Sequence, residues 1–246
     1  MSVEREPTNL SVLPRGRHAA PRPVVREVQR ARMLDAMVDA VAEKGYVRVS
    51  VGDVIERAGV SRKTFYEQFA NKEDCFLVAY DTGVDRLLGA IDEAVAAPEA
   101  GWLTAARRGV EVYLTAMAAS PAFARAFLIE VLGAGPQALA RRDVVQERFA
   151  AQLAAIHRRA RADIPEIPEL PPHTFRAAVG AVNELVTAHV LEHEAETLPN
   201  LTDAILDVHL ALLVGRELAA RIGTPAASPA LPDHPEISAI PDRGRG

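Results

Sequence analysis

Residues 50–74, SVGDVIERAGVSRKTFYEQFANKED, predict two short helices joined by a tight turn. Ser50 is a favourable N-cap, and Asp53 stands three residues later, where its carboxylate can complete a capping box. Gly59 suits the left-handed conformation that ends a helix, and Ser61 then supplies the cap of the next helix. The segment therefore contains start and stop signals for both helices.

A third helix is expected directly after this pair, because Asn71 and Asp74 repeat the capping pattern. Two short helices around such an elbow form a helix-turn-helix unit, whose second helix enters the major groove of DNA. The sequence therefore predicts double-stranded DNA as a partner of this chain.

The second helix separates into a buried face and a polar face. Phe65 and Phe69, four residues apart, are expected to face the core. Lys63 can donate to guanine and Gln68 can pair with adenine, while serines at helix starts favour phosphate. The predicted DNA-binding residues are Arg48, Ser50, Ser61, Arg62, Lys63, Thr64, Tyr66, Gln68 and Lys72.

Charge is unevenly distributed along this chain of net charge −5. Residues 1–75 contain 13 Lys and Arg against 11 Asp and Glu, whereas residues 76–246 contain 15 against 22. A basic head on an acidic body suits a protein that meets DNA with one end.

The composition is that of a globular protein, with 49% hydrophobic and 25% charged residues. The single cysteine, Cys75, cannot form an internal disulfide, which favours a reducing compartment. We find neither an apolar run long enough to span a bilayer nor a signal peptide. We therefore predict a cytoplasmic location.

Apolar residues recur at helical spacing from residue 24 onward, and no stretch alternates like a strand. The predicted fold class is all-α, with an N-terminal three-helix helix-turn-helix domain followed by a helical ligand-binding and dimerisation domain. The predicted segments are a flexible Arg/Pro-containing arm (1–23), the DNA-binding domain (24–71), the ligand-binding and dimerisation domain (72–222) and a disordered tail (223–246). The predicted helices span residues 24–44, 51–58, 62–69, about 72–97, 102–119, 121–132, 137–162, 173–195 and 201–221.

The arm has two interpretations. Arg15, Gly16 and Arg17 can lie in the minor groove beside the site read by the head, as arginine-containing arms do. Alternatively, the arm is an untethered tail. The residues alone do not choose between these interpretations.

The last two long helices are candidates for a dimer interface, because Ala177, Gly180, Ala181 and Ala188 allow close helix approach. A small-molecule cavity is expected among the middle helices, with His157 as a further polar candidate. The alternative is that these residues fill ordinary core. The predicted cavity residues are Trp102, Tyr113, Met117, Phe123, Phe127, Phe149 and Asn183.

Other chemistry has little support in the sequence. His189 and His193 have a spacing that can hold Zn²⁺, but no cysteine is close in sequence, so we favour surface histidines. No phosphate-binding loop, dinucleotide fingerprint or nucleophile elbow is present. We therefore predict no metal, no cofactor and no enzymatic activity.

The run GVSRKTFYEQFANKEDCF, residues 59–76, resembles the signature of the TetR family of bacterial transcriptional regulators. The resemblance covers about residues 24–80. It implies a homodimer with N-terminal DNA-binding domains and C-terminal domains that bind a small ligand and pair the subunits. It also implies that Lys63, Tyr66, Gln68 and Lys72 lie where members contact DNA, whereas Glu67 departs from the family's pattern.

The predicted function is accordingly that of a TetR-like transcriptional regulator. It would be a repressor that binds palindromic operator DNA as a dimer and is released by a small-molecule effector. Alternatives are an effector-independent architectural DNA-binding protein and a helical enzyme with a regulatory head.

Overall fold

The computed structural model describes residues 22–96, 101–215, 218 and 221. Within these residues the chain forms nine α-helices, three short 3-10 helices and no strand, so the predicted all-α class is confirmed. The predicted tail and all but the last two residues of the predicted arm lie outside the described part. None of the described helices has the length and apolar character needed to cross a membrane.

The N-terminal head contains three α-helices and one 3-10 helix, and the remaining elements form the body. The head comprises α1 (Arg22–Lys44), η1 (Tyr46–Arg48), α2 (Val51–Ala58) and α3 (Arg62–Tyr66). The body comprises α4 (Lys72–Val95), α5 (Trp102–Ala119), α6 (Pro121–Leu128), η2 (Glu130–Gly133), α7 (Pro136–Asp163), α8 (Pro172–Glu192), η3 (Ala195–Leu201) and α9 (Thr202–Leu213).

Local hydrogen bonds fix the helix-turn-helix as the sequence predicts. The Asp53 amide donates to Ser50 Oγ at 3.3 Å, and the Ser50 amide donates to Asp53 Oδ2 at 2.8 Å, which completes the capping box. Gly59 ends α2 in the left-handed conformation, with φ 63° and ψ 42°. Phe65 and Phe69 are both buried, as expected, and hold α3 against the head core.

Several predicted boundaries are wrong because tertiary contacts or local turns end the helices earlier. The predicted 62–69 helix ends at Tyr66, where Arg26 of α1 donates to the Glu67 carbonyl and Gln68 donates to the Arg26 carbonyl. The predicted 121–132 helix ends at Leu128 and continues as η2. The predicted last helix gives way at Leu213, two residues before Gly215 adopts φ 91°.

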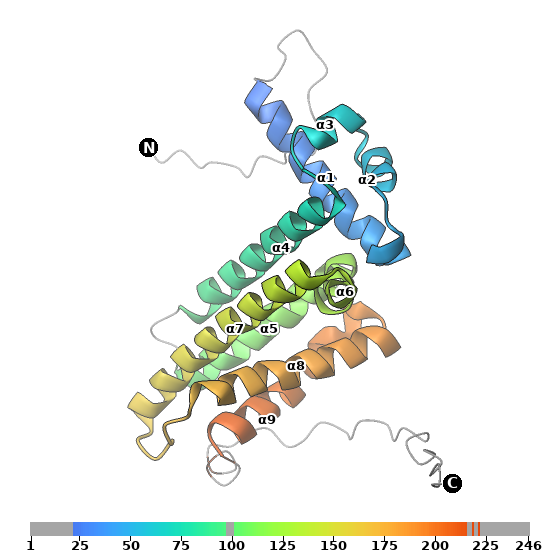
Figure 1. Cartoon of the computed structure of the whole chain (residues 1–246). Coiled ribbons are helices and arrows are strands. Elements are labelled where there is room, and N and C mark those ends of the chain that lie inside the picture. Colours follow the sequence, from blue (N-terminus) through green and yellow to red (C-terminus); the bar gives the residue numbers. More distant parts are fainter. Residues whose placement is uncertain (1–21, 97–100, 216–217, 219–220, 222–246) are drawn as a thin grey trace, which may run out of the picture.

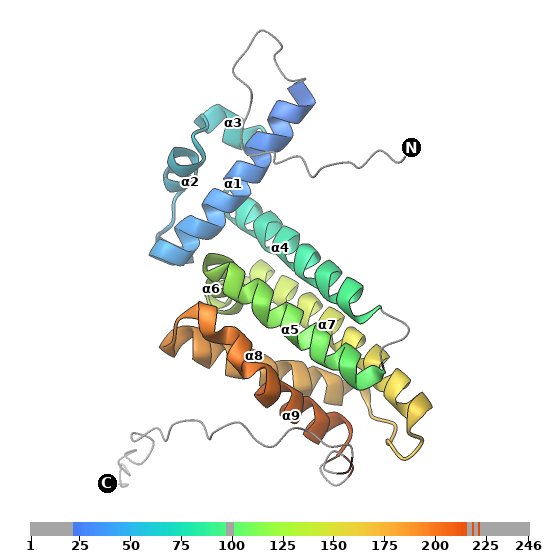
Figure 2. The same ribbon diagram turned by 180° about the vertical axis from the view of Figure 1, so that it is seen from behind.

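The body is arranged in tiers (Figures 1 and 2): α4 faces the head, α5 and α7 lie in the middle, and α8 and α9 lie on the far side. One continuous hydrophobic core extends from Met33 of α1 to Leu206 of α9. Head and body therefore share a core, and α4 passes through both parts.

A hydrogen bond joins the head to the body besides α4 itself, and a close contact within the body holds α4 against α6. The Tyr46 amide of η1 donates to Glu130 Oε2 of η2 at 2.9 Å. At the junction of α4 and α6, Gly83 lies so close to the Phe123 ring that an added Cβ would stand 2.1 Å from Cε2. The absent side chain at Gly83 therefore lets Phe123 pack directly against the backbone of α4.

We expect Gly83→Ala to lower the free energy of unfolding by about 1–3 kcal/mol, because the methyl group overpacks against Phe123. Gly89→Ala is the matched control, since Gly89 lies in the same helix with open space around it. Gly89→Ala should instead raise the free energy of unfolding by about 0.5–1 kcal/mol, the usual gain in helix propensity. Urea denaturation measures both.

The double variant Gly83→Ala, Phe123→Leu separates the clash from other effects of the substitution. If the ring causes the loss, the smaller side chain restores part of the stability. Equal stabilisation by alanine at positions 83 and 89 would contradict this account of the junction.

Candidate DNA-binding surface and ligand cavity

The outer face of α3 presents exposed basic and aromatic side chains. Arg62, Lys63 and Tyr66 are exposed, whereas Phe65 of the same helix is fully buried. Lys63 Nζ lies 3.8 Å from Glu67 Oε1, and the Lys63 side chain is 87% exposed. Because a solvated i,i+4 pair contributes little free energy, Lys63 can leave Glu67 for a DNA base or phosphate.

The serine and threonine residues that we predict to contact DNA form hydrogen bonds within the head. Ser61 Oγ accepts the Thr64 amide at 3.0 Å and lies 2.9 Å from Thr64 Oγ1. Ser50 Oγ donates to Asp53 Oδ2 at 2.7 Å, while Lys44 and Ser50 hold the pKa of Asp53 well below its usual range. These hydroxyls set the orientation of α2 and α3, and their place in DNA binding stays a prediction.

The flanking basic residues differ in how they are held. Lys72 Nζ donates to the Tyr46 carbonyl at 2.9 Å and lies 4.3 Å from the centre of the Tyr46 ring. Desolvation lowers the pKa of Lys72. Arg48 is exposed, and its Nε donates to the Lys44 carbonyl at 2.6 Å. Because of its two contacts with Tyr46, Lys72 also fixes the start of α4 to η1.

Gln68 follows the end of α3 and contacts α1. Its Nε2 donates to the Arg26 carbonyl at 3.3 Å, so this amide nitrogen is used inside the head. Arg62, Lys63 and Tyr66 are consequently the most accessible of the predicted contacts on α3 itself.

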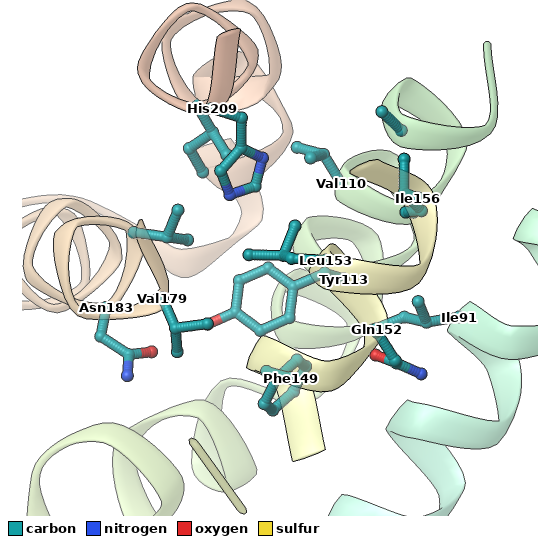
Figure 3. Close-up of a pocket in the computed structure, with 14 residues that line it drawn as sticks. Ile91, Val110, Tyr113, Phe149, Gln152, Leu153, Ile156, Val179, Asn183 and His209 are labelled. Atoms are coloured by element: carbon teal, nitrogen blue, oxygen red, sulfur yellow. The ribbon is translucent and has the colours of Figure 1, made fainter. Parts of the chain in front are cut away.

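A cavity in the body is bordered by five helices, α4, α5, α7, α8 and α9 (Figure 3). Its volume is about 80 Å³, and about 650 Å³ when the open solvent around its mouth is included. Its wall is almost wholly apolar, with a few polar groups among the aliphatic side chains, which is the usual character of a small-molecule site. The lining residues are Ile91, Ala106, Gly109, Val110, Tyr113, Phe149, Gln152, Leu153, Ile156, Val179, Val182, Asn183, Ile205 and His209.

The polar groups of this wall differ in whether they have a hydrogen-bond partner. Gln152 Nε2 donates to Asp92 Oδ1 at 2.6 Å. The Tyr113 hydroxyl is buried without a hydrogen-bond partner among the described residues, and burial raises the pKa of Tyr113. An unsatisfied buried hydroxyl costs about 1–3 kcal/mol in a protein. The His209 ring points into the cavity, and desolvation lowers its pKa to about 4.

The structure brings together some of the predicted cavity residues and separates others. Tyr113, Phe149 and Asn183 line the cavity, and Phe127 lines a smaller adjoining one. The others lie elsewhere: Phe123 lines a groove between α1, α4, α5 and α6, Trp102 and His157 border a separate small cavity, and Met117 is buried in the main core.

Sequence reasoning missed His209, Gln152 and the aliphatic wall. Each of them sits at an ordinary helical position, and only the packing of α7 and α9 brings them to one space. No local sequence signal marks such residues.

The cysteine and the histidine pair considered in the sequence analysis are held by contacts within the protein. Burial raises the pKa of the Cys75 thiol to about 12, so it stays protonated. His189 and His193 have ring centres 4.8 Å apart, and His189 Nε2 lies 2.7 Å from Thr197 Oγ1. In the part of the chain that the structure describes, no group of three potential ligands could hold a metal ion.

Comparison with known proteins finds a family model that matches the head. Residues 33–79 match the family described as "Bacterial regulatory proteins, tetR family". The chain is 35% identical over 113 residues to the HTH-type transcriptional regulator EthR of Mycolicibacterium smegmatis, covering 46% of this chain and 51% of that one. It is 27% identical over 70 residues to the HTH-type transcriptional activator FasR of the same organism, covering 28% and 32%. The matches thus span about half the length of these relatives or less.

Solved structures resemble the chain over more of its length. FadR from Bacillus subtilis, in complex with stearoyl-CoA, superposes with a TM-score of 0.65 and 21% identity, covering 76% of this chain and 98% of that one. PfmR from Thermus thermophilus gives a TM-score of 0.60 and 21% identity, covering 76% and 96%. At this identity the likeness establishes the fold alone.

The low pKa of His209 predicts a pH dependence of stability. As pH falls from about 6.5 to about 4, the unfolded chain binds the proton before the folded protein does. The contribution is therefore complete above about 6.5 and is lost toward 4, by at most about 1.4 kcal/mol per pH unit. His209→Gln should reduce this slope in urea denaturation at several pH values.

His173→Gln is the matched control, because His173 is an exposed histidine at the start of α8. It should leave the slope unchanged. The burial of His157 and His189 also lowers their pKa values, so some slope remains in every variant. An unaltered slope in His209→Gln would contradict the assigned environment.

Proposed function

Because residues 33–79 match the tetR family of bacterial regulatory proteins, we propose that the chain is a member of that family and a repressor of transcription. It binds palindromic operator DNA as a homodimer and releases that DNA when a small apolar effector enters the cavity of the body. The carrying observation is a complete helix-turn-helix head joined by one helix, α4, to a body with an apolar cavity between its helices.

The geometry of the head supports major-groove binding. The elbow is fixed by caps on both sides, and the two buried phenylalanines orient α3 so that its basic face is exposed. A rigid helix of this kind can present side chains to base edges, while flanking cations meet the phosphates.

Lys63→Ala should weaken binding to an operator, selected from a random duplex pool, by about 1–3 kcal/mol and relax base choice at one position. Fluorescence anisotropy on the selected sequence and its single-base variants measures this effect. Arg158→Ala, which removes an exposed cation from α7 in the body, is the control and should bind as the wild type does.

Each outcome of this selection is informative. A palindrome supports two half-sites read by a dimer. An equal loss on every sequence would assign Lys63 to a phosphate instead of a base. Coating of all duplexes alike would favour the architectural alternative over a regulator.

The outer face of α8 and α9 is the proposed subunit interface. Ala177, Gly180 and Ala188 of α8 are exposed, as are the large apolar side chains of Leu191 (61%) and Leu212 (42%). Small residues let two helices approach closely, and apolar side chains exposed beside them favour burial against a second copy. A four-helix arrangement about a two-fold axis would bury this face in both subunits.

Gly180→Arg should convert the dimer to a monomer, because the new side chain and its charge would occupy the proposed interface. Gly89→Arg is the control, since Gly89 is likewise exposed with open space around it but lies in α4. Sedimentation velocity at several concentrations measures the change. A dimer that survives Gly180→Arg would place the interface elsewhere.

Release by an effector requires a ligand that prefers the head spacing unsuited to DNA. Helix α4 is the proposed lever, because Ile91 lines the cavity while Cys75 and Phe76, near the start of the same helix, belong to the core shared with the head. An operator footprint that a cavity ligand abolishes would support this mechanism, and turnover of the ligand would favour an enzyme.

A further inference from the structure

A second, smaller cavity adjoins the main one and differs from it in polarity. Phe149 and Asn183 line both spaces, so the two spaces adjoin at these side chains. We call the second space the polar recess; it is small, with a volume of about 20 Å³, room for about one water-sized group. Its walls are formed by Tyr80, Phe127, Leu128, Arg142, Val145, Gln146, Phe149, Asn183 and Thr187.

Arg142 provides a positive charge in the recess that is not paired with any carboxylate of the described residues. Within the described residues, no acidic side chain lies within salt-bridge distance of its guanidinium, whereas Arg141 and Arg148 of the same helix pair with Asp81 and Asp85. With the Gln146 amide oriented to satisfy its neighbours, its oxygen accepts from Arg142 at 2.8 and 3.0 Å. A neutral amide orients the guanidinium without cancelling its charge.

The same Gln146 oxygen also accepts from Asn183 Nδ2 at 3.1 Å. Gln146 therefore places Arg142 and Asn183 side by side at the boundary between the two spaces. A group arriving there from the main cavity meets the remaining donors of the guanidinium.

Two buried phenol groups add donors at this boundary. The hydroxyls of Tyr80 in the recess and Tyr113 in the main cavity have no hydrogen-bond partner among the described residues. Both side chains are more than nine-tenths buried, at 3% and 7% exposure. Buried polar groups are normally paired, so two unpaired hydroxyls beside an unbalanced cation indicate a missing acceptor.

We propose that the effector is an amphiphile whose apolar chain fills the main cavity and whose carboxylate occupies the polar recess, held by Arg142 and the Tyr80 and Tyr113 hydroxyls. This inference rests on the proposed function, because it assigns the ligand class of the same site. The planar guanidinium suits a carboxylate with two parallel hydrogen bonds, and the surrounding donors suit an anion better than an alcohol or an ammonium group.

The experiment compares three probes of equal chain length, dodecanoate, 1-dodecanol and dodecylamine, by calorimetric titration of the full chain and by release of the selected operator. The wild type should bind dodecanoate at least about tenfold more tightly than dodecanol, as a charge-assisted contact predicts, and dodecylamine least tightly. Dodecanoate should also release the operator at the lowest concentration.

Arg142→Gln should remove the preference for dodecanoate while leaving the affinity for dodecanol nearly unchanged. Arg148→Gln is the matched control, because it removes an arginine from the same helix that pairs with Asp85. It should keep the full preference. Tyr80→Phe and Tyr113→Phe should lower the affinity for dodecanoate without lowering the free energy of unfolding, since neither hydroxyl is paired in the free protein.

Equal affinity of the wild type for dodecanoate and dodecanol would contradict the proposal that the effector is a carboxylate amphiphile. An equal loss of affinity for both probes in Arg142→Gln would contradict it as well. In that case an alcohol that still releases the operator leaves the proposed function intact. If none of the three probes binds, the carboxylate amphiphile is overturned, and an operator that still dissociates with another apolar compound again leaves the proposed function standing.

Discussion

The continuous packing between head and body depends on one helix and a series of aromatic rings attached to it. Phe76 and Tyr80 of α4 have ring centres 6.4 Å apart; Phe76 lies 4.9 Å from Tyr46 of the head, and Tyr80 lies 5.5 Å from Phe127 of the body. The Tyr46 amide is in turn bonded to Glu130 of the body. Because packed aromatic rings have few alternative arrangements, a change in the angle of α4 must be accommodated at these contacts. The head is thus attached to the body through a packed junction instead of a loose linker.

The head could be predicted from the sequence because its determinants are local. Ser50, Gly59 and Ser61 act on backbone groups within a few residues, and each adopts the conformation that its residue type favours. The end of α3 could not be predicted in the same way. It is set by Arg26 and Gln68, which meet only after α1 has packed across the head. Boundaries fixed by tertiary contacts leave no periodic signal.

The cavity was predicted less well, for a different physical reason. Aromatic size and middle-helix position singled out Tyr113 and Phe149, which line the cavity, but the same features describe buried residues such as Met117 and Trp102, which do not. Whether a large side chain fills space or borders it depends on how five helices pack. His209 and Arg142 were missed because a lone polar residue in an amphipathic helix usually faces solvent. Their environments arise from neighbours distant in sequence, so composition and spacing contain no trace of them.

Ligands in the main cavity and in the polar recess would contact α4 at different points. Tyr80 borders the polar recess and Ile91 borders the main cavity, about 16 Å apart along the helix axis. A ligand confined to the main cavity would press only on the Ile91 end, far from the head. A ligand in both chambers would also engage Tyr80, whose ring packs between Phe76 and Phe127. Contacts at two separated points constrain the direction of a rod, whereas one contact constrains only a position. An amphiphile that spans both chambers is therefore better suited than a purely apolar ligand to select one orientation of α4, and hence one spacing of the heads.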